Sequence, residues 1–228
     1  MKMGGVALCA MMMFACDNND APFQDGRTIV SDFESTNDDW TGEYVEYDKV
    51  QEDIMEFKLQ RAALPATLDT TKKAMKIEGH NRSDDMFMYL KKKVAGLEPN
   101  RTYSVTLEVQ FATNYPANSV GIGGSPGSSV YMKAGASPSE PTKKLEGTYY
   151  TVSIDKGQQA TGGKEMPLIG DVSNGVDDFV YKLVKRSTET PVQVKANAQG
   201  EIWLCVGTDS GFEGKTILYY DKITAVIR

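Results

Sequence analysis

Hydrophobic and polar residues alternate along two long stretches of the chain, which is the pattern of half-buried β-strands. In residues 102–111 every second side chain is aromatic or aliphatic, and the side chains between them are polar. In residues 217–227 the odd positions are apolar except for Asp221. Each stretch is predicted to be a strand with one face turned to a core. Residues 201–228 are predicted to form two long strands joined by a turn-rich loop at 207–214.

Asp221 is placed by this alternation on the apolar face of the last strand, between Tyr219 and Ile223. An ionised carboxylate in a core needs a partner that offsets the loss of hydration. Two kinds of partner stay open. One is a set of backbone amides and hydroxyls in the adjoining loop, and the other is a cation.

Shorter apolar runs, separated by turn-forming residues, predict further strands along the chain. Residues 86–90 are apolar on both faces, as in a central strand. The chain shows no internal repeat, no coiled-coil heptad and no linker within residues 27–228. About ten short strands with turns between them indicate an all-β sandwich or barrel, predicted as one domain over residues 27–228.

The first residues are predicted to direct the protein to a membrane. One lysine is followed by an apolar run over residues 3–15, which ends at Cys16. This run is shorter than the roughly 20 residues that span a bilayer, but it suits the core of a signal peptide. Met13-Phe14-Ala15-Cys16 resembles the lipobox of bacterial lipoproteins.

The lipobox resemblance implies that residues 1–15 are removed, that Cys16 carries a lipid, and that residues 16–26 form a polar tether. The acidic residues after Cys16 are similar to those that send some Gram-negative lipoproteins to the cell surface. The expected location is the outer membrane, through the lipid on Cys16, on either its periplasmic or its cell-surface face. The alternative is a plain secretory signal followed by a disordered tail.

Composition and charge narrow the function classes. The chain has 25 basic and 31 acidic residues, a net charge of −6 at pH 7, which disfavours a nucleic-acid partner. His80 is the only histidine, which excludes a histidine-rich metal site. Gly123-Gly124-Ser125-Pro126-Gly127 has the spacing Gly-x-Ser-x-Gly, but no helix is expected after it, so it does not mark a strained nucleophile elbow. Cys205 lies in an apolar run, as a small buried hydrophobe does.

Three loop regions offer residues that suit a ligand, because binding side chains on rigid β scaffolds are often borne on loops. The first is a cluster of oxygen-bearing side chains at 81–85, for which turn-stabilising hydrogen bonds are the alternative explanation. The second is glycine-rich, and the third is charged. The candidate ligand-binding residues are Asn81, Ser83, Asp84, Asp85, Gly123, Gly124, Ser125, Lys133, Asp155, Lys156 and Gln158.

Three short motifs, in this order, resemble those of jelly-roll carbohydrate-binding modules. They are Phe33-Glu34 with Trp40, Leu97-x-Pro99-x-x-x-Tyr103, and Tyr220-Asp221-x-Ile223. The resemblance implies a jelly-roll, galactose-binding-like β-sandwich with a glycan or other small ligand. It also implies a structural calcium ion held by Glu34 and Asp221. Other segments are similar to uncharacterised secreted lipoproteins, which imply no function.

The sequence therefore predicts a cell-envelope lipoprotein with a non-catalytic, ligand-binding β-sandwich. One alternative is a carbohydrate-active hydrolase that uses loop carboxylates, pairing Asp84 or Asp85 with Asp155 or Glu140. The other alternative is a structural or partner-binding envelope protein.

Overall fold

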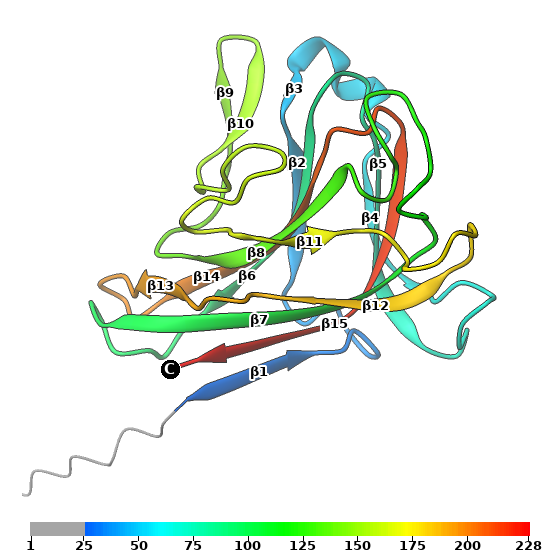
Figure 1. Ribbon diagram of the computed structural model, residues 1–228. Helices are drawn as coiled ribbons and strands as arrows, with labels where there is room; N and C mark the ends of the chain where they lie inside the picture. Colours follow the sequence, from blue (N-terminus) through cyan, green and yellow to red (C-terminus); the bar gives the residue numbers. More distant parts are fainter. Residues whose placement is uncertain (1–25) are drawn as a thin grey trace, which may run out of the picture.

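The two strands with the clearest alternation lie side by side in one sheet (Figure 1). They are β7 (Thr102–Thr113) and β15 (Lys215–Ile227) in a computed structural model that describes residues 26–228. Their inward side chains, Val105, Leu107 and Val109 on β7 among them, are 0–2% exposed. The hydrophobic pattern of residues 102–111 therefore predicts both the strand and its buried face correctly.

The first sheet is antiparallel and contains seven strands. Its main order is β12 (Lys182–Ser187), β7, β15, β5 (Lys73–His80) and β4 (Lys58–Ala63). In addition, β1 (Arg27–Ser31) pairs with β15, and β13 (Val192–Lys195) pairs with β7. β4 is therefore an edge strand of this sheet.

The second sheet is also antiparallel and faces the first across the core. Its order is β11 (Leu168–Asp171), β8 (Val130–Ser137), β14 (Ile202–Ser210), β6 (Met86–Val94) and β2 (Thr41–Val45). Apolar side chains from both sheets form one large buried cluster between them. The predicted all-β, jelly-roll-type sandwich is confirmed.

A third, smaller sheet contains β3 (Tyr47–Asp48), β10 (Tyr149–Val152) and β9 (Lys143–Glu146). A 3₁₀ helix, η1 (Lys49–Ile54), follows β3. The hairpin of β9 and β10 projects from one end of the sandwich, at the top of Figure 1.

Residues 153–167, here called the roof segment, cover part of the outer face of the second sheet. Ile154 and Met166 of the roof pack with Phe87 and Cys205, whose side chains point away from the main core. A Cβ atom on Gly135 of β8 would lie 1.8 Å from the carbonyl oxygen of Glu165, so only glycine allows this close approach.

Asp221 is the extra residue of a β-bulge, which corrects the predicted face assignment of the last strand. Tyr220 pairs with Phe111 and Lys222 with Gln110, so the register shifts at Asp221. Before the bulge the even positions point inward, and after it the odd positions do. The prediction that all odd positions from 217 to 227 share one face is therefore wrong for the first half of the strand.

The expectations for the N-terminus concern a part of the chain that the structure does not describe. The signal peptide, Cys16 and all but the last residue of the tether lie outside residues 26–228, and they stay predictions. Within residues 26–228, no helix is long and apolar enough to cross a membrane.

Candidate binding sites

A buried cluster of charged side chains lies between the second sheet and the roof segment. Lys133 of β8 and Asp209 of β14 point to the outer face of that sheet, and both side chains are 0% exposed. The Lys133 ammonium donates to Oδ2 of Asp209 at 2.6 Å. It also donates to the carbonyl oxygens of Lys156 and Gln158, at 2.9 and 2.8 Å. Lys133 therefore ties the roof to the sheet.

Lys156 of the roof segment forms ion pairs with the same cluster. Its Nζ lies 2.7 Å from Oδ2 of Asp209 and 2.6 Å from Oε1 of Glu46. The same ammonium donates to the carbonyl of Gly157 and lies 5.2 Å from the centre of the Phe87 ring. Glu46 directly follows β2, so these ion pairs connect β2, β14 and the roof segment.

Three carboxylates of this cluster crowd together. Glu46, Asp85 and Asp209 each place an oxygen within 4.8 Å of the others. Burial, followed by the charges of Glu46 and Asp209, raises the pKa of Asp85 to about 8. Burial and the Asp209 charge raise the pKa of Glu46 to about 7, against the opposing effect of Lys156. Burial also acts to raise the pKa of Asp209, but the two lysines and hydrogen bonds outweigh it and hold the pKa below its usual range.

A polar pocket of about 290 Å³ opens onto this cluster, and we call it the end pocket. It is lined by Glu46, Asp85, Lys156, Gly157, Gln158 and Gln159. Tyr149 lies near its carboxylates and is 39% exposed. Burial and the charges of Asp85 and Glu46 raise the pKa of this phenol.

The end pocket brings together several of the predicted ligand-binding residues. Asp85, Lys133, Lys156 and Gln158 all belong to the cluster or to the pocket lining. The backbone carbonyl of Asp84 accepts a hydrogen bond from Nε2 of Gln159 at 2.6 Å, so the first and third loops meet here. Whether these residues bind a ligand stays a prediction.

Other predicted site residues have local structural partners. Asn81 donates through Nδ2 to the carbonyls of Ser210 and Phe212, and its Oδ1 accepts from the amide of Ser83. Asp155 accepts hydrogen bonds from the amides of Gly157 and Lys164 within the roof. The bond between Asn81 and Ser83 is of the turn-stabilising kind, whereas the two Nδ2 bonds of Asn81 connect this turn to the end of β14.

The glycine-rich loop also closes on itself. Ser125 Oγ accepts hydrogen bonds from the amides of Gly127 and Ser128. Gly123 has φ +72°, and a Cβ there would lie 2.4 Å from the carbonyl oxygen of Gly211. Gly124 has φ +156° and packs as closely against Ser129. The geometry therefore explains why glycine stands at these two positions.

Glu34 and Asp221, the predicted calcium ligands, have separate partners. Oδ2 of Asp221 accepts a hydrogen bond of 2.6 Å from Nε2 of Gln110. Glu34 is exposed, and its Oε2 accepts from the backbone amide of Lys73 at 3.1 Å. A calcium ion shared by these two residues stays a prediction.

Sequence reasoning missed Glu46, Asp209 and Gln159. The predicted loop at 207–214 is too long, because β14 continues to Ser210 and carries Asp209 within the strand. The available signal was the period-two alternation that places Asp209 on the same face as Cys205. Glu46 directly follows β2 and has a positive φ of 67°, a backbone conformation that the local sequence does not predict.

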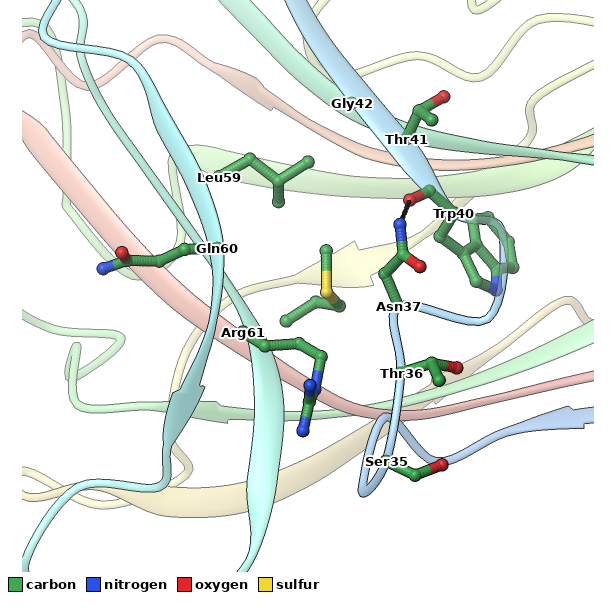
Figure 2. Close-up of a pocket in the computed structure, with 10 residues that line it drawn as sticks. Ser35, Thr36, Asn37, Trp40, Thr41, Gly42, Leu59, Gln60 and Arg61 are labelled. Atoms are coloured by element: carbon green, nitrogen blue, oxygen red, sulfur yellow. Dashed lines mark hydrogen bonds between the residues drawn. The ribbon is translucent and has the colours of Figure 1, made fainter.

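A larger pocket of about 580 Å³, here called the side pocket, lies between the edge strands β2 and β4 (Figure 2). Each strand is at the edge of its own sheet, so the pocket is an opening along the side of the sandwich. Its apolar lining comes from Trp40, Leu59 and Met75. Its remaining lining residues are Ser35, Thr36, Asn37, Thr41, Gly42, Gln60 and Arg61.

The walls of the side pocket are held in place by hydrogen bonds. Trp40 is 1% exposed and donates from Nε1 to Ser31 Oγ at 2.9 Å. Asn37 Nδ2 donates to the Trp40 carbonyl at 3.1 Å (Figure 2). Arg61 donates to the carbonyls of Phe33 and Glu34, both at 3.0 Å, and so fixes the loop after β1 to β4. The pocket is therefore preformed.

No family model matches the chain, and no curated protein matches it. Among solved structures, a carbohydrate-binding module that recognises mannan, TmCBM27, is 10% identical, with a TM-score of 0.39 and coverage of 89% of this chain and 99% of that one.

Two further structures are similar. The K1 cleaved adhesin domain of Lys-gingipain from Porphyromonas gingivalis W83 is 12% identical, with a TM-score of 0.38 and coverage of 89% of this chain and 98% of that one. The enzymatically active domain of tailspike protein 4 from bacteriophage CBA120 is 10% identical, with a TM-score of 0.37. The alignment covers 85% of this chain but spans only 20% of the tailspike chain.

Proposed function

We propose that this chain is a cell-envelope lipoprotein whose β-sandwich binds a glycan without cleaving it, and that the glycan lies in the side pocket. The observation that carries the proposal is the lining of this pocket. The half-buried Leu59, beside the buried side chains of Trp40 and Met75, is combined there with hydroxyl, amide and guanidinium groups on the surrounding residues.

This lining suits the chemistry of a sugar. A sugar ring has apolar C–H faces and hydroxyl groups around its edge, so it needs an apolar contact together with several hydrogen-bonding groups. The volume of about 580 Å³ lies within the usual range for small-molecule pockets. Because the pocket is open along the side of the sandwich, a longer chain can extend beyond it.

The same lining supports binding over hydrolysis. Glycosidases generally use a pair of Asp or Glu residues on either side of the scissile bond. None of the ten described residues that line the side pocket is acidic. A bound glycan in this position would therefore meet no carboxylate pair.

A glycan array followed by calorimetric titration of the best oligosaccharide tests the binding. Ser35→Trp should block the mouth of the pocket, since Ser35 is an exposed lining residue, and should weaken binding at least tenfold. Ser139→Trp places the same ring on another exposed loop position and should leave the affinity unchanged. Equal affinity of both variants and the parent would refute the assignment to the side pocket.

The envelope assignment is tested separately. It rests on the lipobox-like residues that end at Cys16. Metabolic labelling with a palmitate analogue should label the parent chain and fail to label Cys16→Ala. Label that persists in Cys16→Ala would refute lipidation at this residue.

A hydrolase acting at the end pocket is the second candidate function. The observation in its favour is the crowding of Glu46, Asp85 and Asp209, with raised pKa values for two of them. The array glycans should be incubated with the protein and analysed for shorter products. Turnover that is lost in Asp85→Asn would favour the hydrolase. An empty array together with a captured envelope protein would favour the partner-binding alternative.

A further inference from the structure

Three buried carboxylate oxygens of the end-pocket cluster have no hydrogen-bond donor among the described residues while all three groups are ionised, and only a proton on Asp85 would link its carboxyl to Asp209. They are Oε2 of Glu46, Oδ1 of Asp85 and Oδ1 of Asp209. Asp209 is 0% exposed, so water from the bulk does not reach its free oxygen. Leaving a buried charged acceptor unsatisfied is costly, and such atoms in folded proteins call for a specific explanation.

The two lysines of the cluster donate no hydrogen bond to these three oxygens. A lysine ammonium has three N–H donors. Lys133 already has three acceptors, which are Asp209 Oδ2 and two backbone carbonyls. Lys156 also has three, which are Asp209 Oδ2, Glu46 Oε1 and the carbonyl of Gly157. Each lysine is therefore saturated.

The arrangement divides the oxygens of Asp209 and Glu46 into two groups. One oxygen of each carboxylate faces an ammonium, and the other remains free. Within residues 26–228 no lysine lies within salt-bridge distance of Asp85, which lies close to both of the other carboxylates. With three carboxylates and two ammonium groups, the ionised cluster has a net charge of −1.

We propose that Glu46, Asp85 and Asp209 bind one hard cation, of the calcium or sodium class, through the oxygens that the lysines leave free. Carboxylate oxygens are the ligands that such cations prefer. The cation would supply the positive charge that the cluster lacks, and it would share the carboxylates with the lysines. Glu46 and Asp85 also line the end pocket, which provides a route for entry and room for water ligands.

Such a cation would have a structural consequence. Glu46 follows β2, Asp85 precedes β6 and Asp209 lies near the end of β14. The ion would therefore join three segments of the second sheet directly beneath Lys156 of the roof. This site differs from the calcium site that the sequence suggests at Glu34 and Asp221.

Thermal unfolding of the purified full chain tests the proposal. The protein is first stripped with EDTA and then exchanged into a chelator-free choline buffer at pH 8.5. CaCl₂, MgCl₂ and NaCl are titrated against choline chloride of equal ionic strength. CaCl₂ or NaCl should raise the Tm by about 5–10 °C at a concentration about 100-fold above the Kd, and the Tm should keep rising with the logarithm of the salt concentration. The salt that acts at the lower concentration identifies the cation.

Asp85→Asn is the diagnostic variant, because it removes a proposed ligand without leaving a lysine unpaired. It should fold, as judged by circular dichroism, and lose most of the cation-dependent Tm shift. Asp84→Asn is the matched control, since Asp84 is an exposed neighbour, and it should retain the shift. Asp221→Asn should also retain it, which separates this site from the sequence-predicted one.

Terbium luminescence gives a second readout that does not depend on unfolding. Tb³⁺ is a hard cation that tyrosine sensitises at short range, and Tyr149 lies near the cluster. One equivalent should produce luminescence that Ca²⁺ displaces and that Asp85→Asn abolishes. The proposal is overturned if no cation shifts the Tm beyond the choline control. It is likewise overturned if the Tm shift survives Asp85→Asn, in which case the cation binds at another place on the protein.

Discussion

Replacing Lys133 with methionine tests whether the buried ion pairs hold the roof segment on the second sheet. Methionine keeps most of the length of the lysine side chain but removes its charge and its three donors. In Lys133→Met, the carbonyls of Lys156 and Gln158 lose their partner, and Asp209 keeps only Lys156.

The expected cost follows from these losses. The buried carbonyl of Lys156 and the partly buried carbonyl of Gln158 cost about 1 kcal/mol each without a donor, and the weakened charge pairing of Asp209 costs about 1–2 kcal/mol. Burying methionine instead of an ammonium recovers about 1 kcal/mol, because the charged group no longer has to be dehydrated. The net destabilisation should be about 2–3 kcal/mol, which corresponds to a Tm decrease of about 5–10 °C for a domain of this size.

Urea denaturation monitored by circular dichroism, together with a thermal melt, measures this effect. Lys144→Met is the matched control, because Lys144 is an exposed residue of β9 and should change stability by less than about 0.5 kcal/mol. The double variant Lys133→Met, Asp209→Asn should lose less stability than the two single variants together, since the partners interact directly. A Tm decrease of less than about 2 °C for Lys133→Met, or strict additivity in the double variant, would refute the role given to this pair.

Two further predictions concern the same face of the sandwich. The pKa values of Glu46 and Asp85 are raised to about 7 and about 8, from ordinary values of 4.5 and 3.8, so the folded chain binds these protons more tightly than the unfolded chain. In EDTA the urea midpoint should therefore fall as pH rises from about 4 to about 8. Asp85→Asn should reduce this fall. A midpoint that rises over this range contradicts the assignment of these pKa values. Gly135→Ala should displace the roof, because its Cβ would lie 1.8 Å from the Glu165 carbonyl oxygen, and limited proteolysis should then cut within residues 153–167. Resistance equal to that of the parent would show that the contact is dispensable.

More of the fold than of the candidate sites can be predicted from the sequence. Alternation in residues 102–111 is a local property, and it predicts the strand and its buried face. The bulge at Asp221 escapes this reasoning because Ile217 and Tyr219 are apolar, so the pattern looks uninterrupted although the inward face changes. A bulge is visible only in the pairing with β7.

The candidate sites depend on contacts between distant residues. Lys133 and Asp209 are 76 positions apart, and they meet because β8 and β14 pair in one particular register. The sequence draws attention to Lys133 and to the loops at 81–85 and 155–158, but it does not indicate Asp209 or Glu46 as their partners. The sequence gives even less indication of the side pocket, because this pocket forms where the edges of two different sheets face each other.

The most direct test of the proposed function is a crystal structure of the protein with the oligosaccharide that the glycan array selects. The proposal predicts an intact sugar ring between β2 and β4, packed on Leu59 and hydrogen-bonded to groups on the rim of the side pocket. Sugar bound only in the end pocket or on an outer face of either sheet would contradict it, and a cleaved product beside Asp85 would replace binding with hydrolysis.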